Sequence, residues 1–178
     1  MFNWDGSNQF FVRVNYDSND ASSWSPPYPG ADNRWYRMDF TIHTSDIGKN
    51  NGTYTISLHD PNSGSSIKSE VVGNALSYKN TSAFYKWILW QNYIGNGVTN
   101  QNTWLDDLYI QVGTKARVEI GDKPNWENCV FREIQPPESW SDGNIRVRLN
   151  HGAFQGDETA YLFVVDENGN ASSGYPIT

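Results

Sequence analysis

Apolar and polar residues alternate along several short stretches of this chain, with the two-residue period of a β-strand that buries one face. The clearest stretch is residues 34–44, followed after a turn rich in Gly and Asn by residues 53–59. One face of the two stretches is apolar and carries Tyr36, Met38, Phe40, Ile42, Tyr54, Ile56 and Leu58. The other face carries Trp35, Arg37, Asp39, Thr41, His43, Thr53, Thr55, Ser57 and His59. The pattern predicts an antiparallel hairpin with one face in the core and the other available for a ligand.

Short segments rich in β-branched and aromatic residues continue on both sides of this hairpin, separated by turn residues. We expect further strands at residues 9–17, 66–72, 84–94, 104–112, 115–120, 130–135, 144–149 and 160–166. Residues 18–33 are rich in Ser, Asn, Asp and Pro and are predicted to form a long loop, and Pro136-Pro137 is predicted to end a strand. The predicted fold class is therefore all-β.

Composition and charge narrow the partners of the protein. The 178 residues, of which 37% are hydrophobic, are enough to bury a core in one sandwich or in two small ones. Acidic residues outnumber basic ones, giving a formal charge of −7 that repels a phosphate backbone, so no nucleic-acid partner is expected. The longest apolar run, Leu162–Val165, is too short to span a bilayer, so no membrane insertion is expected.

Cys129 is the single cysteine of the chain, so no disulfide can form within it. No histidine is near it in the sequence, and a catalytic cysteine needs a base. We expect a buried or semi-buried thiol that contributes packing and no chemistry.

Residues 9–113 contain four features that together suggest a known fold. They are an alternating strand with early Trp35 and Arg37, a turn ending in Asn51-Gly52 before a strand, a Gly-flanked aromatic strand from Trp87 to Gly95, and a closing strand with paired acids at Asp106-Asp107. In this combination the segment resembles the concanavalin A-like jelly-roll sandwiches of the polysaccharide-lyase and laminarinase-like kind. The resemblance implies an antiparallel β-sandwich. Because such sandwiches have further N-terminal strands, we expect this one to be N-terminally incomplete and the chain to belong to a larger protein.

A second set of residues lies in the segment 116–178. It comprises Val118 with Gly121, then Trp140-Ser141-Asp142 before a strand at Ile145, then Gly169 and Ser172 before the last strand. This segment resembles the C-terminal part of the immunoglobulin-like domain known as IPT or TIG, which is common in bacterial surface proteins. The two resemblances predict a jelly-roll-like sandwich at residues 1–121 and an immunoglobulin-like β-segment at residues 122–178.

The jelly-roll resemblance implies that the closing strand adds Tyr109 and Gln111 to the polar face. The predicted ligand-binding residues are Trp35, Arg37, Asp39, His43, His59, Tyr109 and Gln111. With Thr41 and Ser57 they can hydrogen-bond sugar hydroxyls and stack on a pyranose ring. The set predicts a glycan cleft, and the alternative is a solvated sheet face with ordinary cross-strand pairs.

The same residues are candidates for enzymatic chemistry. A polysaccharide lyase needs a base and a group that stabilises negative charge, roles open to His43, His59, Tyr109, Arg37 and Gln111. The chain lacks the Gln-x-His pairing and the Lys/Tyr-rich closing strand of alginate-lyase-like proteins. Glycoside hydrolysis needs two carboxylates across one bond, whereas adjacent side chains such as those of Asp106 and Asp107 point to opposite faces of a strand. No catalytic residue is assigned.

The acidic residues and the histidines are the candidate ligands of a metal ion. Asp46, Asp60, Asp106 and Asp107 are candidate ligands of a structural Ca²⁺, although no loop has the spacing of a calcium motif. The three histidines have no zinc-ligand spacing. We expect no cofactor and leave a structural calcium ion open.

The prediction that follows is a non-catalytic carbohydrate-binding or adhesion module of a larger microbial surface or secreted protein, located outside the cell or on its surface. Its partner would be a polysaccharide or other glycan, and neighbouring domains of the larger chain. The first alternative is a structural subunit of an extracellular fibre, sheath or virion that self-associates through open strand edges. The second alternative is a polysaccharide lyase.

Overall fold

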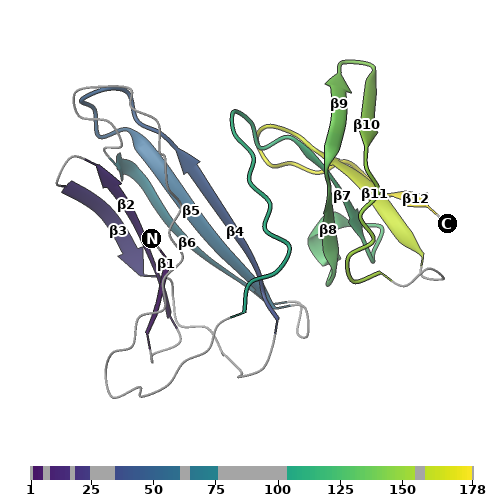
Figure 1. The fold of residues 1–178 in the computed structure, drawn as a ribbon, viewed down its shortest axis with the longest axis horizontal. Coiled ribbons are helices and arrows are strands. Elements are labelled where there is room, and N and C mark those ends of the chain that lie inside the picture. The colour runs from purple at the N-terminus through teal and green to yellow at the C-terminus, as the bar shows by residue number, and fades with distance from the viewer. Residues whose placement is uncertain are drawn as a thin grey trace. The chain divides into compact units, whose positions relative to one another are not determined.

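The computed structural model describes residues 2–5, 9–16, 19–24, 35–60, 65–75, 104–154 and 159–177 (Figure 1). The elements are β1 (Phe2–Asp5), β2 (Gln9–Tyr16), β3 (Asn19–Trp24), β4 (Arg37–His43), β5 (Gly52–Asp60), β6 (Ser65–Ala75), β7 (Arg117–Gly121), the 3-10 helix η1 (Trp126–Asn128), β8 (Arg132–Gln135), β9 (Pro137–Ser141), β10 (Asn144–Val147), β11 (Ala160–Val165) and β12 (Tyr175–Ile177). The predicted strand at 84–94 lies outside the described residues.

The strands form small sheets in which every strand pair between named strands is antiparallel. Their orders are β1-β2-β3, β4-β5-β6, β12-β11-β7-β8 and β10-β9. The predicted all-β, antiparallel character is therefore confirmed. The described residues do not show a closed sandwich or a jelly roll, and those finer features stay predictions.

The chain divides into two compact units. The first contains Met1–Asp60 and Ser65–Trp104, and the second contains Pro61–Gly64 and Leu105–Thr178. Strand β7, which the sequence assigned to the first domain, makes its hydrogen bonds with β8 and β11 of the second unit.

In the first unit, the prediction of a long loop directly after β2 is wrong for residues 19–24. These residues form β3 and pair with β2 from Tyr16↔Asn19 to Phe11↔Trp24. The Ser, Asn and Asp content of the segment has weak strand preference, but hydrogen bonding to an existing strand overrides it. Strand β3 in turn lies near β6, so the two sheets of this unit approach each other there.

The β4–β5 hairpin matches the alternation seen in the sequence. Tyr54, Ile56 and Leu58 of β5 are buried, as predicted. On β4 the apolar face is less covered, and Ile42 is 37% exposed. The difference follows from position, because β5 is flanked by β4 and β6 whereas β4 is at the edge of this sheet.

In the second unit, the four-stranded sheet buries apolar residues on both faces. On one face Ile120 packs with Phe154 and Ala160, and Leu162 and Ile177 pack against them. On the opposite face of β11, Phe163 and Val165 are fully buried. Burial on both sides explains why β11 is almost continuously apolar in sequence rather than alternating.

A loop between β7 and β8 packs against this second face. The Asp122 carboxylate accepts hydrogen bonds from the backbone N–H groups of Val130 and Phe131 at 2.8 and 3.1 Å, which closes the loop. Cys129 is buried as predicted, and its thiol contacts the carbonyl oxygens of Lys123 and Asn125 at 3.4 Å. Burial raises the pKa of this thiol and so disfavours the reactive thiolate.

The same loop and strand β7 together provide partners for a carboxylate inside the unit. Glu119 of β7 is completely buried, and it accepts hydrogen bonds from Arg117 Nε at 2.7 Å and from the Trp126 indole N–H at 2.6 Å. The guanidinium of Arg132 stacks on the Trp126 ring, 3.9 Å from its centroid. These contacts make a buried acid tolerable at the centre of a sheet.

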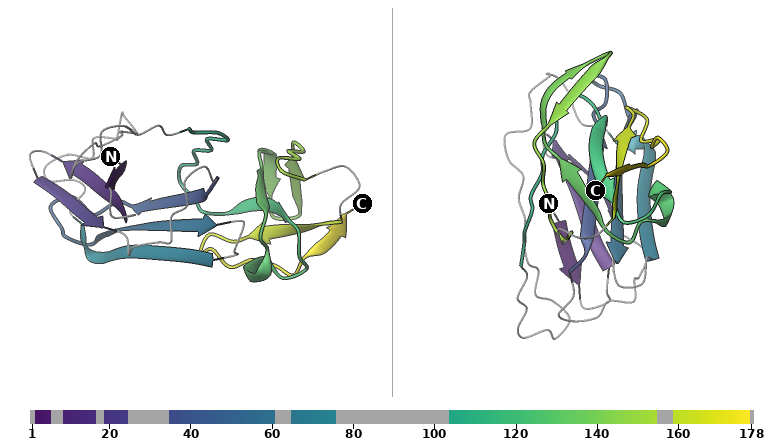
Figure 2. Two further views of the ribbon diagram at one scale, coloured as in Figure 1. Left: turned by 90° about the horizontal axis from the view of Figure 1, so that it is seen from below. Right: turned by 90° about the vertical axis from the view of Figure 1, so that its right-hand side faces the viewer.

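Strands β9 and β10 form a hairpin that the sequence prediction recovered only in part. It extends beyond the four-stranded sheet of its unit (Figures 1 and 2). Pro136-Pro137 does end β8, but β9 begins directly at Pro137. Trp140 is 43% exposed and pairs with Ile145 across the hairpin.

Candidate functional site

The β4–β5 hairpin presents a polar face formed by Arg37, Asp39, Thr41 and His43 of β4 and Thr53, Thr55, Ser57 and His59 of β5. The register pairs Arg37 with His59, Asp39 with Ser57, Thr41 with Thr55 and His43 with Thr53. Directly opposed residues of an antiparallel pair project from the same side of the sheet. The structure therefore brings four predicted site residues, Arg37, Asp39, His43 and His59, onto one face.

A turn with its own hydrogen bonds fixes this register. Asp46 and Asn51 bond to each other twice, from the Asp46 backbone N–H to Asn51 Oδ1 at 2.9 Å and from Asn51 Nδ2 to Asp46 Oδ2 at 3.0 Å. Lys49 Nζ also donates to Asp46 Oδ2 at 2.9 Å. The side-chain bonds from Lys49 and Asn51 lower the pKa of Asp46, so the ionised carboxylate supports the turn.

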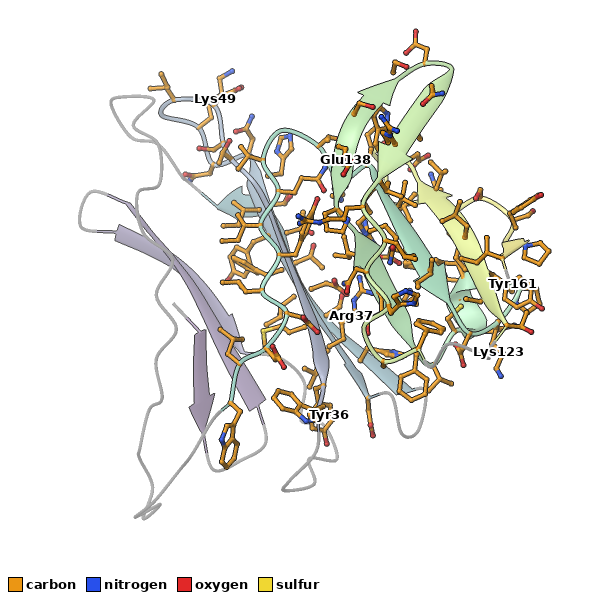
Figure 3. The ribbon with its side chains drawn as sticks, turned by 45° about the vertical axis from the view of Figure 1, so that its right-hand side comes forward. Tyr36, Arg37, Lys49, Lys123, Glu138 and Tyr161 are labelled. Atoms are coloured by element: carbon orange, nitrogen blue, oxygen red, sulfur yellow. The ribbon has the colours of Figure 1, made fainter. Side chains whose placement is uncertain are left out.

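Arg37 and Asp39 form an ion pair along β4. Arg37 Nε donates to both carboxylate oxygens at 3.2 Å, and Nη2 donates to Oδ1 at 3.1 Å. Figure 3 labels Arg37 at the start of β4. The Arg37 side chain is 18% exposed and that of Asp39 is 41% exposed, so the carboxylate is the more accessible partner.

Burial divides the polar face into a covered end and an accessible end. His59 is 6% exposed, and the next residue, Asp60, is 8% exposed. His59 was predicted to contact a ligand, and its burial leaves no room for that contact in this structure. At the other end His43 is exposed, and Thr41, Thr53, Thr55 and Ser57 are partly exposed.

Trp35 directly precedes β4, two residues before Arg37, and is 60% exposed. A large indole that is mostly in solvent offers a flat apolar surface beside polar groups. Trp35 was predicted to stack on a sugar ring, and stacking requires an indole that is exposed to solvent.

The remaining two predicted residues, Tyr109 and Gln111, belong to the second unit. Residues 104–112 were predicted to form a strand, but no strand is assigned to them. The chain takes a positive φ of 49° at Asp107, which interrupts an extended run. The Tyr109 hydroxyl donates to Gln111 Oε1 at 3.2 Å, and Gln111 Nε2 donates to the carbonyl of Ala116 at 2.8 Å. Their membership in the polar face stays a prediction.

Strand β6 adds residues that the sequence analysis did not include. Its register places Lys68 opposite Ser57 and Glu70 opposite Thr55. The sequence analysis did not include them because the alternation within residues 66–72 does not show with which strand this segment pairs.

Metal binding and glycoside hydrolysis would each require a particular group of side chains among the described residues. No group of three or more His, Cys, Asp or Glu side chains suited to a metal ion occurs among them. The carboxylate of Asp46, one candidate calcium ligand, accepts hydrogen bonds from Lys49 and Asn51. Asp39 is the sole carboxylate among the eight residues of the polar face, whereas glycoside hydrolysis uses two. The hydroxyl, guanidinium and carboxylate groups of this face can donate and accept hydrogen bonds.

Comparisons with family models, with curated proteins and with solved structures each found no match to this chain. The predicted resemblances to concanavalin A-like jelly rolls and to IPT or TIG domains therefore stay predictions beyond their antiparallel β character. Across the described part of the chain, no helix is long and apolar enough to cross a membrane.

Proposed function

We propose that the chain is a non-catalytic carbohydrate-binding or adhesion module of a larger microbial surface or secreted protein, acting outside the cell. The observation that carries the proposal is the polar face of β4 and β5 with the exposed Trp35 next to it. A jelly-roll-like first domain and an immunoglobulin-like second one belong to the same proposal, and antiparallel sheets are consistent with both.

The chemistry of the face fits sugar recognition. Hydroxyl groups of Thr and Ser both donate and accept hydrogen bonds, as sugar hydroxyls do. The Arg37–Asp39 pair places a fixed donor group beside a fixed acceptor group. An exposed indole can cover the apolar face of a pyranose ring. Strand pairing holds the groups of β4 and β5 in place, which limits the freedom that they lose on binding.

Replacing Trp35 tests this proposal. We expect Trp35→Ala to weaken binding to the recognised polysaccharide by about tenfold or more, ~1.4 kcal/mol, because the stacking surface is removed. Binding would be found on a glycan array and quantified by titration calorimetry.

The matched control is Trp104→Ala. Trp104 is another exposed tryptophan, 68% in solvent, and it is not one of the eight residues of β4 and β5 that define the polar face. Its replacement should leave affinity unchanged, and both variants should keep the unfolding transition of the parent protein. Equal losses from the two variants would show that binding is not located on this face.

A second candidate is self-assembly into an extracellular fibre, sheath or virion, favoured by the β9–β10 hairpin. In the described residues these two strands pair with each other alone, so the outer edge of each carries backbone groups without a strand partner. Such edges can add strands from another chain. The half-exposed Trp140 would provide apolar area for that contact.

A further inference from the structure

Charges on the β4–β5–β6 sheet occur as neighbours of opposite sign. On β4, Arg37 and Asp39 are joined by three hydrogen bonds of 3.1 to 3.2 Å. On β6, Lys68 and Glu70 are two residues apart and occupy register positions next to Ser57 and Thr55. The backbone register thus gives this side of the sheet as many basic as acidic residues.

Because Arg37 is paired with Asp39, the charge of a sugar determines how well it can bind to the polar face. Uronate and sulfate groups are recognised through charge-assisted hydrogen bonds, most effectively by a guanidinium that offers two parallel donors. In Arg37 the edge formed by Nε and Nη2 is already occupied by the Asp39 carboxylate. An anionic sugar would have to displace that carboxylate and would be repelled by it.

We propose, building on the carbohydrate-binding function above, that the polar face binds a neutral polysaccharide and discriminates against polyuronates and sulfated glycans. The accessible member of the ion pair is Asp39, whose side chain is 41% exposed against 18% for Arg37. A carboxylate accepts strong hydrogen bonds from neutral sugar hydroxyls. The formal charge of −7 on the whole chain further disfavours a polyanion.

The first experiment compares two groups of probes on the unmodified protein. Neutral probes are β-glucan and galactomannan, and anionic probes are alginate and pectate. We expect at least a tenfold preference for a neutral probe, and binding that changes less than about twofold between roughly 0.05 and 0.5 M NaCl, because ionic attraction is screened over this range.

The second experiment changes the charge balance. Asp39→Asn keeps the size of the side chain and removes the negative charge that is paired with the Arg37 guanidinium. We expect it to weaken neutral-probe binding by about tenfold and to create salt-sensitive binding of alginate. The control is Asp142→Asn, which makes the same change of net charge at an exposed turn of the second unit and should alter neither affinity.

The outcomes separate this inference from the function on which it rests. If the unmodified protein prefers alginate or pectate and Trp35→Ala abolishes that binding, the inference is overturned while carbohydrate binding stands. If no polysaccharide binds, both are overturned. If Asp39→Asn fails to fold, the neutral-to-anionic ratio and the salt response of the unmodified protein still decide the question.

Discussion

At the scale of single residues, the described turns depend on carboxylates that accept hydrogen bonds. Asp166 Oδ1 accepts from the backbone N–H groups of Asn168 and Asn170 at 2.9 and 2.8 Å, and Oδ2 accepts from Asn170 Nδ2 at 3.0 Å. In the turn after β4, Asp46 Oδ2 likewise accepts from side chains, those of Asn51 and Lys49, while the Asp46 backbone N–H donates to Asn51 Oδ1. Both turns therefore need the ionised form of one aspartate.

The side-chain and backbone hydrogen bonds from Asn170 are the main reason that the pKa of Asp166 lies below its ordinary value of 3.8. A carboxyl whose pKa is depressed by folding stabilises the protein at a pH above the unfolded pKa, and this contribution is lost as the pH falls through the folded pKa. The contribution of Asp166 should therefore be complete at neutral pH and should fade below about pH 4.

Asp166→Ala tests this pH dependence. The unfolding temperature should fall relative to the parent protein at pH 7, and the difference should narrow as the pH is lowered from about 4 to 2.5. Glu167→Ala, at the neighbouring exposed position, is the control and should have little effect at any pH. A difference between Asp166→Ala and the parent protein that is constant with pH would show that the charge of Asp166 does not support the turn.

At the scale of elements, the loop between β7 and β8 and the sheet are fitted closely to each other. Gly121 ends β7, and a Cβ atom there would lie 2.5 Å from Cys129 Sγ and 3.0 Å from the Phe163 ring. Gly174 has a comparable role near β12, where a Cβ would lie 2.8 Å from the carbonyl oxygen of Pro124. Glycine at these positions lets the loop lie directly on the sheet.

Gly121→Ala should destabilise the protein by about 1–3 kcal/mol, because the added methyl group overfills a packed region. The control is Gly143→Ala in the β9–β10 turn, where a Cβ would meet nothing within 4 Å and where the change should stay within about 0.5 kcal/mol. Urea unfolding followed by tryptophan fluorescence measures both. Similar stabilities for the two variants would contradict the close packing of loop and sheet.

At the scale of the whole molecule, two proposals for the function predict different sizes in solution. A carbohydrate-binding module acts as a single chain, whereas assembly through the edges of β9 and β10 requires contacts between chains. The exposed Trp140 belongs to the hairpin that would make such contacts. Mass in solution therefore distinguishes the two proposals before any ligand has been identified.

We expect size-exclusion chromatography with light scattering to give a monomer of 20.2 kDa. A large, regular oligomer would instead favour assembly, and Trp140→Lys would then be expected to reduce its size because a charge enters the apolar contact. Trp104→Lys, a matched change at an exposed tryptophan that is not part of the hairpin, should leave the mass unchanged. A monomeric parent protein over a wide concentration range would rule against assembly by this chain alone.

The sequence by itself determined most of the strands and the polar face of the β4–β5 hairpin. Alternation of side chains and turn residues are local properties, and the Asp46–Asn51 turn fixes the register between neighbouring strands. The apolar face of β5 was predicted for the same reason, whereas the burial of Cys129 was predicted from the absence of a histidine near it in the sequence. The loop predicted at 19–24 and the strand predicted at 104–112 were both wrong. Local composition does not show whether a segment will hydrogen-bond to a neighbouring strand.

Only the tertiary structure decided which strands pair across long stretches of sequence and what covers each face. The order β12-β11-β7-β8 joins distant segments, and no local pattern specifies it. The burial of His59 and the exposure of Trp140 also depend on neighbours brought together by folding. Hydrogen-bonded sheets and covered faces are made by segments far apart in the chain, which is why their consequences for the site appear only in the folded protein.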